Sequence, residues 1–404
     1  MFVSLTGCGS TITGTAAEQP YQPLPIATAS AHQQQVVDGA LALSTDLKSA
    51  LVRGDSAAAC LIGTDAPDAM RACAALPDGV RGVRAMFSPD GTRYAVLEDF
   101  NRSFSGRVWI VDSATGSARE VRVDTRPADP SGASGGTSST GTSPSSSMST
   151  GTSPTGIAPP GTSSPATPPS AGSSSTTSTG SRTALDAAII GVFWRSDVEL
   201  VGVGLTSIFR IDAGAGAPTA KVLAVVGSRQ RPIRMWAFSH TAVAVLNGST
   251  VVTIALDSGT VTDPAATVGS QGNARPTLLG VSQDGSRLLI SDSDVQTLRP
   301  GPTTVYGVND KKATVIQQPD DTYTFAGAFS PDGSQVVLIS RAGKFTSGSS
   351  PGAAVQLVPA TGGRPRTIGT VDQPPFGPLS WSRNNVLMDT APYSTARQVW
   401  KLTG

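Results

Sequence analysis

Histidine is nearly absent from this sequence, whose 404 residues include only two, His32 and His240. There is no His-Glu-x-x-His pattern, no Cys-x-x-Cys pair and no histidine cluster, so the usual ligand sets of a zinc site are missing. His240 falls in a predicted turn and His32 in a polar stretch, where solvated side chains are a simpler interpretation than catalytic bases. We therefore expect no catalytic residue, no bound metal and no cofactor.

Charge is also scarce, because charged residues make up 15 % of the chain and the formal net charge is +1. A nucleic-acid-binding protein needs a basic face to neutralise phosphates, so we expect no nucleic-acid partner. The sequence has no run of 18 apolar residues, which excludes a membrane-spanning helix within it.

Only three cysteines are present, and the first of them lies close to the N-terminus. Cys8 follows Leu5-Thr6-Gly7 and precedes Gly9, a pattern that resembles a bacterial lipobox. We expect residues 1–8 to be the remnant of a lipoprotein signal peptide and residues 9–20 to be a tether. The chain would then be exported and held at the outer face of the cell membrane by lipid alone. A chance match is the alternative, because the seven residues before Cys8 leave no room for a complete signal peptide.

Residues 126–182 consist almost entirely of Ser, Thr, Gly and Pro. Such a composition cannot bury enough apolar surface to fold, so we predict that this stretch is disordered. It could separate two domains, but an internal repeat argues that it is a loop within one domain.

Three segments share one pattern, in which a strand ends, the chain turns at Ser-x-Asp-Gly, and a second strand returns. Weaker copies occupy the intervals. There are seven copies, and the residues that align with Ser88 in them are 44, 88, 195, 239, 282, 330 and 382. The spacing is about 45 residues once the stretch 126–182 is set aside, and a second hairpin follows within each copy. This period and pattern predict an all-β fold, a seven-bladed β-propeller of four-stranded antiparallel blades over residues 21–404.

The segment Phe87-Ser88-Pro89-Asp90-Gly91 and its copies resemble the WD40-like and TolB-like propeller repeats. The whole chain is most similar to propeller-bearing lipoproteins of actinobacteria, of the LpqB type. The domain that precedes the propeller in those proteins has no counterpart here, so their particular role is not expected to carry over.

The last copy supplies only three strands, so we expect the N-terminal segment Tyr21–Thr28 to close the ring as an outermost strand, where proline is tolerated. Cys60 and Cys73 lie in the second hairpin of the first copy. If that hairpin turns at Asp65–Asp68, the two cysteines face each other directly, and we predict a disulfide between them. Two buried free thiols are the alternative.

Long loops and blade-to-blade connections on one face of the ring are the predicted binding face, although ordinary solvated loops would have the same composition. The candidate residues are Asp99, Asn101, Arg102, Arg229, Arg231, Arg341, Lys344 and Phe376. The stretch 126–182 should leave the ring on this same face. The aspartates of the turns, Asp90, Asp284 and Asp332, could be imagined to hold calcium, but a structural role in the turn is the simpler interpretation.

These patterns predict a monomeric cell-envelope lipoprotein whose propeller binds another envelope protein or a glycan. The alternative is an envelope enzyme that uses the central funnel, such as a lyase, a glycoside hydrolase or a quinone-dependent dehydrogenase. A purely structural role is the third possibility.

Overall fold

The computed structural model describes most of the chain from Tyr21 onward as strands and turns. The described residues are 21–34, 40–44, 46–54, 59–65, 70–74, 76–77, 80, 83–98, 106–127, 188–228, 230–263, 274–294, 299–343, 352–389 and 398–404. The predicted signal remnant, the tether and nearly all of the Ser/Thr/Gly/Pro-rich stretch lie outside them. Within these residues no helix is long and apolar enough to cross a membrane.

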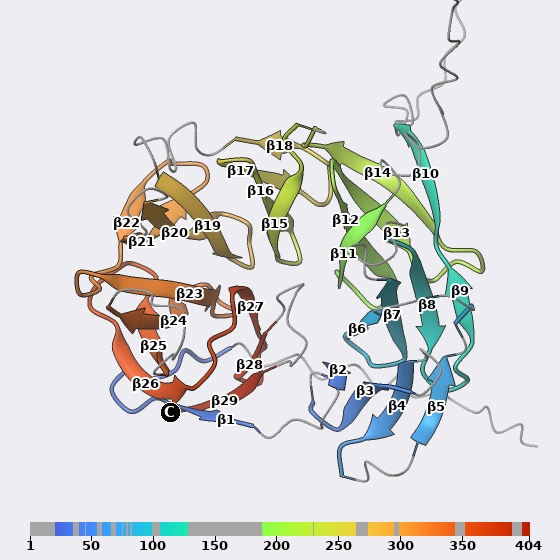
Figure 1. Ribbon diagram of the computed structural model, residues 1–404, viewed down its shortest axis with the longest axis horizontal. Helices are drawn as coiled ribbons and strands as arrows, with labels where there is room; N and C mark the ends of the chain where they lie inside the picture. The colour runs from blue at the N-terminus through green and yellow to red at the C-terminus, as the bar shows by residue number, and fades with distance from the viewer. Residues whose placement is uncertain are drawn as a thin grey trace, which may run out of the picture.

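The strands of the described residues form seven groups of four antiparallel strands, which follow one another around a ring (Figure 1). We number these groups blades 1 to 7 in chain order. Blade 1 contains β2 (Ala40–Leu43), β3 (Ser49–Arg53), β4 (Ala59–Gly63) and β5 (Met70–Ala74). Blade 2 contains β6 (Val83–Phe87), β7 (Arg93–Glu98), β8 (Val108–Asp112) and β9 (Ala118–Glu120). Blade 3 contains β11 (Ile189–Trp194), β12 (Glu199–Gly204), β13 (Ser207–Asp212) and β14 (Thr219–Val225).

The remaining blades continue the same order, with the first strand of each nearest the centre of the ring (Figure 1). Blades 4 to 7 contain β15 (Ile233–Phe238), β16 (Ala242–Asn247), β17 (Thr250–Ala255) and β18 (Val261–Thr262); β19 (Ala274–Val281), β20 (Arg287–Asp294), β21 (Pro300–Gly307) and β22 (Ala313–Val315); β23 (Thr322–Phe329), β24 (Gln335–Ala342), β25 (Ala353–Pro359) and β26 (Arg366–Val371); and β27 (Gly377–Trp381), β28 (Val386–Asp389), β29 (Val399–Thr403) and β1 (Ser30–Gln33). The prediction of an all-β propeller with four-stranded antiparallel blades is confirmed.

The Ser-x-Asp-Gly repeat forms the turn between the first and second strands of a blade. In blade 2, Ser88 Oγ donates a hydrogen bond to Asp90 Oδ1 at 2.6 Å and accepts one from the backbone N–H of Arg93 at 3.0 Å. Gly91 supplies the positive φ of 70° that the turn needs. Blades 1, 5 and 6 repeat the serine–aspartate bond at Ser44–Asp46, Ser282–Asp284 and Ser330–Asp332. The aspartates of these turns therefore have the structural role that the sequence predicted.

These hydrogen bonds also shift the acidity of the turn carboxylates. The hydrogen bond from Ser44 is the main reason why the pKa of Asp46 lies below its ordinary value. At Asp90, Asp284 and Asp332, partial burial by itself raises the pKa, but the hydrogen bonds from two hydroxyl groups and a backbone N–H outweigh it and lower the pKa.

Replacement of Asp332 by asparagine is expected to reduce stability at neutral pH and to make little difference in acid. A carboxylate whose pKa is lowered by folding contributes stability above its unfolded pKa, about 3.9, and that contribution is lost as the pH falls through the folded pKa. Urea unfolding at neutral pH and near pH 2 measures both differences. The matched control is Asp320→Asn, at an exposed aspartate outside these turns. If Asp332→Asn lowers the free energy of unfolding as much near pH 2 as at neutral pH, this explanation is contradicted.

Apolar side chains seal the spaces between neighbouring blades. Among the described residues they form six clusters, which lie between blades 1 and 2, 2 and 3, 3 and 4, 4 and 5, 5 and 6, and 6 and 7. Strands β23 and β27 also pair in parallel, so blades 6 and 7 form one continuous sheet. We call the interface between blade 7 and blade 1 the seam; among the described residues no equivalent cluster lies there.

The ring is closed by the N-terminal segment, but not by the predicted residues. Strand β1 (Ser30–Gln33) pairs antiparallel with β29 as the outermost strand of blade 7, where blue and red ribbons lie side by side (Figure 1). The predicted closing strand Tyr21–Thr28 is not a strand: Pro23 and Pro25 cannot donate backbone hydrogen bonds, and Pro25 O instead accepts the N–H groups of Thr28 and Ala29 in a turn.

The segment Tyr21–Ala29, which we call the strap, runs outward across blades 6 and 7. Tyr21 Oη donates to Asn385 Oδ1 at 3.0 Å, beside the innermost strand of blade 7. The backbone of Leu24 exchanges two hydrogen bonds with the side-chain amide of Gln335, at the start of the second strand of blade 6. Arg366, on the outermost strand, donates to Ala29 O at 2.9 Å.

Strand β10 (Arg122–Pro127) was not predicted. After β9 the chain leaves blade 2 and pairs in parallel with β14, as a fifth strand of blade 3. Arg126 and Pro127, the first two residues of the predicted disordered stretch, belong to this strand, and the rest of that stretch lies outside the described residues.

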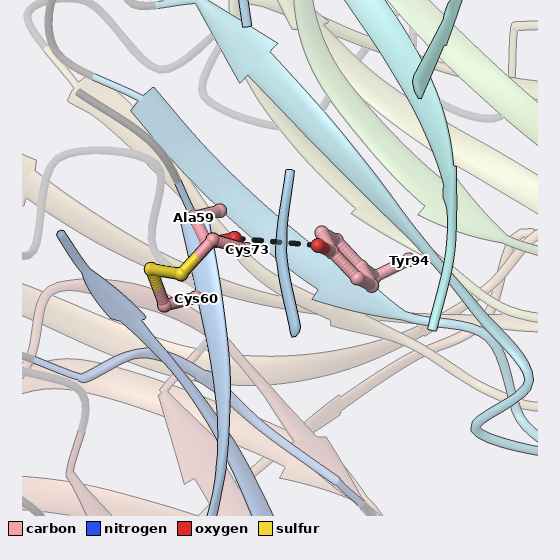
Figure 2. Close-up of a disulfide and its surroundings, with 4 residues drawn as sticks. All are labelled: Ala59, Cys60, Cys73 and Tyr94. Atoms are coloured by element: carbon pink, nitrogen blue, oxygen red, sulfur yellow. Dashed lines mark hydrogen bonds between the residues drawn. A yellow bond between two sulfur atoms is a disulfide. The ribbon is translucent and has the colours of Figure 1, made fainter. Parts of the chain in front are cut away.

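The predicted disulfide between Cys60 and Cys73 is present (Figure 2). The two residues are direct partners on β4 and β5, with their Cα atoms 4.0 Å apart. Cys60 is buried and Cys73 is exposed. In the adjacent blade 2, Tyr94 Oη donates to Ala59 O at 3.3 Å, so the cross-linked hairpin is also joined to its neighbour (Figure 2).

Candidate functional site

A cavity of about 540 Å³ lies on the axis of the ring. Its size is within the range of small-ligand sites, about 300–1,000 Å³. We call it the axial cavity. Its walls include the last residue of the first strand of every blade, the position just before the repeat serine: Leu43, Phe87, Trp194, Phe238, Val281, Phe329 and Trp381.

The repeat itself explains this ring of apolar residues. In each blade the first strand is innermost, so its last residue lies next to the axis and also next to the neighbouring blade. Trp194, for example, belongs to the apolar cluster between blades 2 and 3, and its Nε1 donates to Met86 O at 3.0 Å. Phe193 and Phe238 stack with centroids 4.1 Å apart. The walls of the axial cavity are therefore held rigidly by the core.

Blade 7 contributes more of the wall than any other blade. The other six supply only residues of their first strand and its turn, whereas blade 7 also supplies Met388 of β28 and Val399 of β29. Leu387 and Trp400, next to them in sequence, point the opposite way and pack against blade 6. The axial cavity therefore extends from the axis toward the seam between blade 7 and blade 1.

The mouth of the axial cavity is polar and lies among the turns between first and second strands. We call the side of the ring that carries these turns the turn face, and the opposite side the far face. The rim includes His240, Gln283, Arg383 and Asn384. The described residues that line the cavity include no aspartate or glutamate, so its chemistry is that of aromatic, aliphatic, amide and hydroxyl groups.

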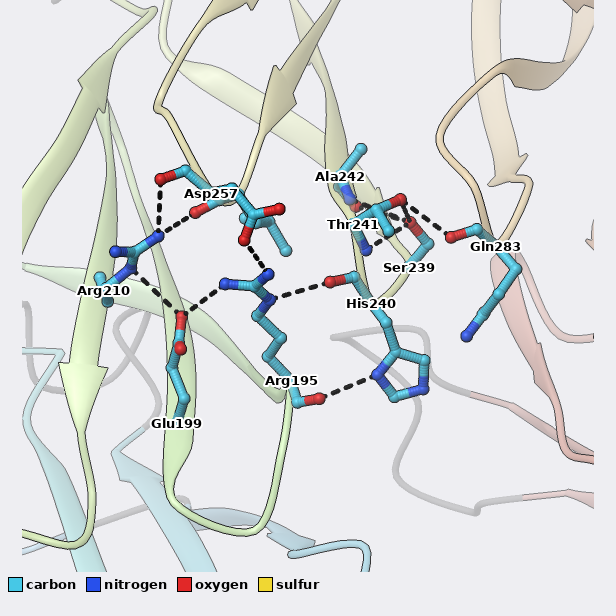
Figure 3. Close-up of polar contacts among 10 residues, drawn as sticks. Arg195, Glu199, Arg210, Ser239, His240, Thr241, Ala242, Asp257 and Gln283 are labelled. Carbon is cyan, nitrogen blue, oxygen red and sulfur yellow. Dashed lines mark hydrogen bonds and ion pairs between the residues drawn. The ribbon is translucent and has the colours of Figure 1, made fainter. Parts of the chain in front are cut away.

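A network of polar contacts braces the rim between blades 3 and 4 (Figure 3). Arg195, which replaces the repeat serine, donates from Nε to His240 O at 2.9 Å and pairs with Glu199 and Asp257. Glu199 also pairs with Arg210 at 3.2 Å.

His240 is an exposed turn residue, as the sequence suggested, and its ring has a second role. Nδ1 lies 2.9 Å from the carbonyl oxygen of Arg195. Because a carbonyl oxygen can only accept, this bond assigns the ring proton to Nδ1 and leaves Nε2 without one in the neutral ring. The imidazole thus forms part of the brace between the two blades. His32 lies in β1, with Nε2 3.2 Å from Ser30 Oγ.

The three predicted binding-face residues that the structure describes do not line the axial cavity. Arg231 and Phe376 are exposed in blade-to-blade connections and Arg341 lies at the end of β24, so all three are on the far face. The remaining candidates are outside the described residues: Asp99, Asn101, Arg102, Arg229 and Lys344. That the far face is a binding face therefore stays a prediction.

The described ends of the long insertion are also on the far face. Strand β10 is parallel to β14, so Pro127 ends at the side where β14 leads into blade 4. The first residue of β11, Ile189, begins on that side as well.

The sequence predicted a central funnel but not the residues that form its walls, because those residues are neither charged nor catalytic in type. The available signal was the apolar residue that precedes every repeat anchor, which is aromatic in five of the seven copies. For metal binding, no group of three His, Cys, Asp or Glu side chains in the described residues could hold an ion.

Comparisons with known proteins do not place the chain in a family. No protein-family model matches it, and no curated protein matches it. Among solved structures it is similar to the β-propeller domain of Cps50 (Swd1) from Myceliophthora thermophila, with 8 % identity, a TM-score of 0.49, and 92 % of this chain and 100 % of that one covered.

Two further solved structures are similar at lower scores. A putative TolB from Agrobacterium tumefaciens has 13 % identity and a TM-score of 0.39, with 79 % of this chain and 88 % of that one covered. KlHsv2 with its loop 6CD replaced by a Gly-Ser linker has 10 % identity and a TM-score of 0.44, with 90 % and 89 % covered. At these values the assignment of the fold depends on the sheet topology of the chain itself.

Proposed function

We propose that this chain is an exported cell-envelope lipoprotein, anchored through Cys8, whose propeller acts as a monomeric binding module for a protein or a glycan. The observation that carries the binding role is the axial cavity. Its walls come from the same position of all seven blades, and its rim supplies hydrogen-bonding groups. A largely apolar cavity with a few polar groups is the usual form of a binding site.

The chemistry of the cavity supports binding over catalysis. A glycoside hydrolase needs two carboxylates on either side of the scissile bond, and a lyase needs a base positioned in the same way. The described lining offers His240 and Arg383 as its only titratable groups, and the His240 ring is part of the brace to blade 3.

A retention experiment with envelope extract tests the binding role. The soluble propeller, residues 21–404, is expected to retain a specific partner both with and without residues 128–182. A variant with the cavity filled, Ser380→Trp, is expected to lose that partner, because the side chain of Ser380 lines the cavity on the seam side. Phe376→Ala changes the far face, which the sequence predicted as the binding face, and this variant is expected to retain the partner. Equal retention by the Ser380→Trp and Phe376→Ala variants would contradict the assignment of the cavity as the site.

A further inference from the structure

The first described residue of the chain lies beside the mouth of the axial cavity. Tyr21 donates its hydroxyl proton to Asn385 Oδ1 at 3.0 Å, and Trp381 Nε1 donates to the same oxygen at 3.2 Å. The rings of Tyr21 and Trp381 meet edge to face with centroids 6.4 Å apart. Since Trp381 is part of the cavity wall, Tyr21 lies against that wall.

The strap fixes this starting point on the turn face. From Tyr21 it passes Gln335 at the beginning of a second strand and then Arg366 on an outermost strand. It therefore runs from near the axis to the edge of the ring, and only then does the chain turn into β1. The two buried hydrogen bonds between Leu24 and Gln335 fix the position of the strap along the blade.

The length of chain between Cys8 and Tyr21 limits how the ring can be oriented. Thirteen residues can span at most roughly 45 Å, whatever their conformation. To reach around to the far face, the tether would first cross about 15 Å of blade and then rise along a strand about 20 Å long. That detour of roughly 35 Å would leave at most roughly 10 Å of the fully extended tether to reach the membrane.

We propose that the axial cavity faces the membrane, and that it receives an apolar side chain on the extracytoplasmic segment of a membrane-anchored protein. This inference rests on the proposed lipid anchor at Cys8. The partner class follows from the position of the mouth and from the lining, because a mouth held close to the bilayer is reached most readily by a polypeptide that emerges from it. Aromatic and aliphatic walls with an amide and hydroxyl rim suit an apolar side chain and the peptide groups that flank it.

Energy transfer from single fluorophores to an acceptor lipid tests the orientation. Cys8 is consumed by the lipid and Cys60 by the disulfide with Cys73, so one introduced cysteine labels uniquely. Two variants are compared as lipidated proteins in vesicles, Asn384→Cys at the cavity mouth and Phe376→Cys on the far face, where the phenylalanine is 58 % exposed. We expect higher transfer from residue 384.

The outcomes separate the inference from the function on which it rests. If the chain carries no lipid by mass and does not float with vesicles, the proposed anchor is wrong. If the chain is lipidated but the fluorophore at residue 376 transfers energy to the acceptor lipid at least as efficiently as the one at residue 384, the orientation is wrong. The proposed anchor then still stands.

Photo-cross-linking in cells tests the partner class. A photoreactive amino acid at position 384 is expected to yield a protease-sensitive adduct that stays with the membrane after alkaline extraction. The same amino acid at position 376 should not yield it, and the adduct should disappear in the Ser380→Trp background. An adduct that is soluble, that is a glycan, or that persists when the cavity is filled would overturn the assignment, as would the absence of any adduct. A denaturant midpoint of the Ser380→Trp variant close to that of the parent protein is expected and would show that the variant is folded.

Discussion

Replacing Gln335 by methionine is expected to lower the free energy of unfolding by about 2–4 kcal/mol. The side-chain amide of Gln335 accepts from Leu24 N at 3.0 Å and donates to Leu24 O at 2.6 Å, and both residues are buried. Methionine keeps the length of the side chain but offers neither group, so two buried backbone groups of the strap lose their partners. Each unsatisfied group costs about 1–3 kcal/mol.

Guanidinium unfolding of the Gln335→Met variant measures the loss. The matched control is Gln283→Met, at an exposed glutamine that makes no contact with the strap, where a change within about 0.5 kcal/mol is expected. A Gln335→Met variant as stable as this control would mean that the strap does not depend on its hydrogen bonds to blade 6.

Removing the disulfide is expected to have a similarly large effect. Cys60 and Cys73 are separated by 13 residues, and closing a loop of this size stabilises a fold by about 3 kcal/mol through the unfolded chain. The Cys60→Ala/Cys73→Ala double variant should therefore unfold at a lower denaturant concentration than the parent. Alanine is chosen because Cys60 is 2 % exposed and a serine hydroxyl would need a new partner.

Reduction provides the internal control for the disulfide. Added dithiothreitol should bring the parent protein toward the midpoint of the double variant and should leave the double variant unchanged. If the parent does not respond to the reductant although thiol titration shows that its disulfide is open, the hairpin does not need the cross-link.

The parts of the fold that depend on local sequence could be predicted well. The turn at Ser88 uses a serine hydroxyl, an aspartate carboxylate and a glycine with positive φ, all within six residues. The same short-range chemistry defines the copies at Ser282 and Ser330, so the repeat was visible without tertiary information. The pairing of Cys60 with Cys73 also followed from one hairpin and its turn.

The parts that depend on long-range geometry could not be predicted in detail. Closure by the N-terminal segment was foreseen, yet the sequence of β1, Ser30-Ala31-His32-Gln33, has little β-propensity and is a strand because of where the strap places it. The crossing of β10 from blade 2 to blade 3 depends on the distance between two blade edges, which no local pattern encodes.

The residues of the axial cavity could not be recognised from the sequence for a different reason. The seven apolar residues that meet at the axis are visible in the sequence, but each is indistinguishable from an ordinary core residue until the ring brings them together. The extension of the cavity toward the seam could not be predicted either, because it depends on which side chains of blade 7 pack against blade 6.

The pairing of β1 with β29 has a consequence for how the chain folds. Ser30 and Thr403 are 373 residues apart, and their hydroxyl groups are 2.8 Å apart in the closed ring. Contacts of such high contact order form slowly, and the first-made part of a chain must wait for the last-made part. During synthesis the edge of blade 7 stays unpaired until β29 has been made, so a chain that lacks residues 399–403 should be trapped as an open, aggregation-prone arc of blades.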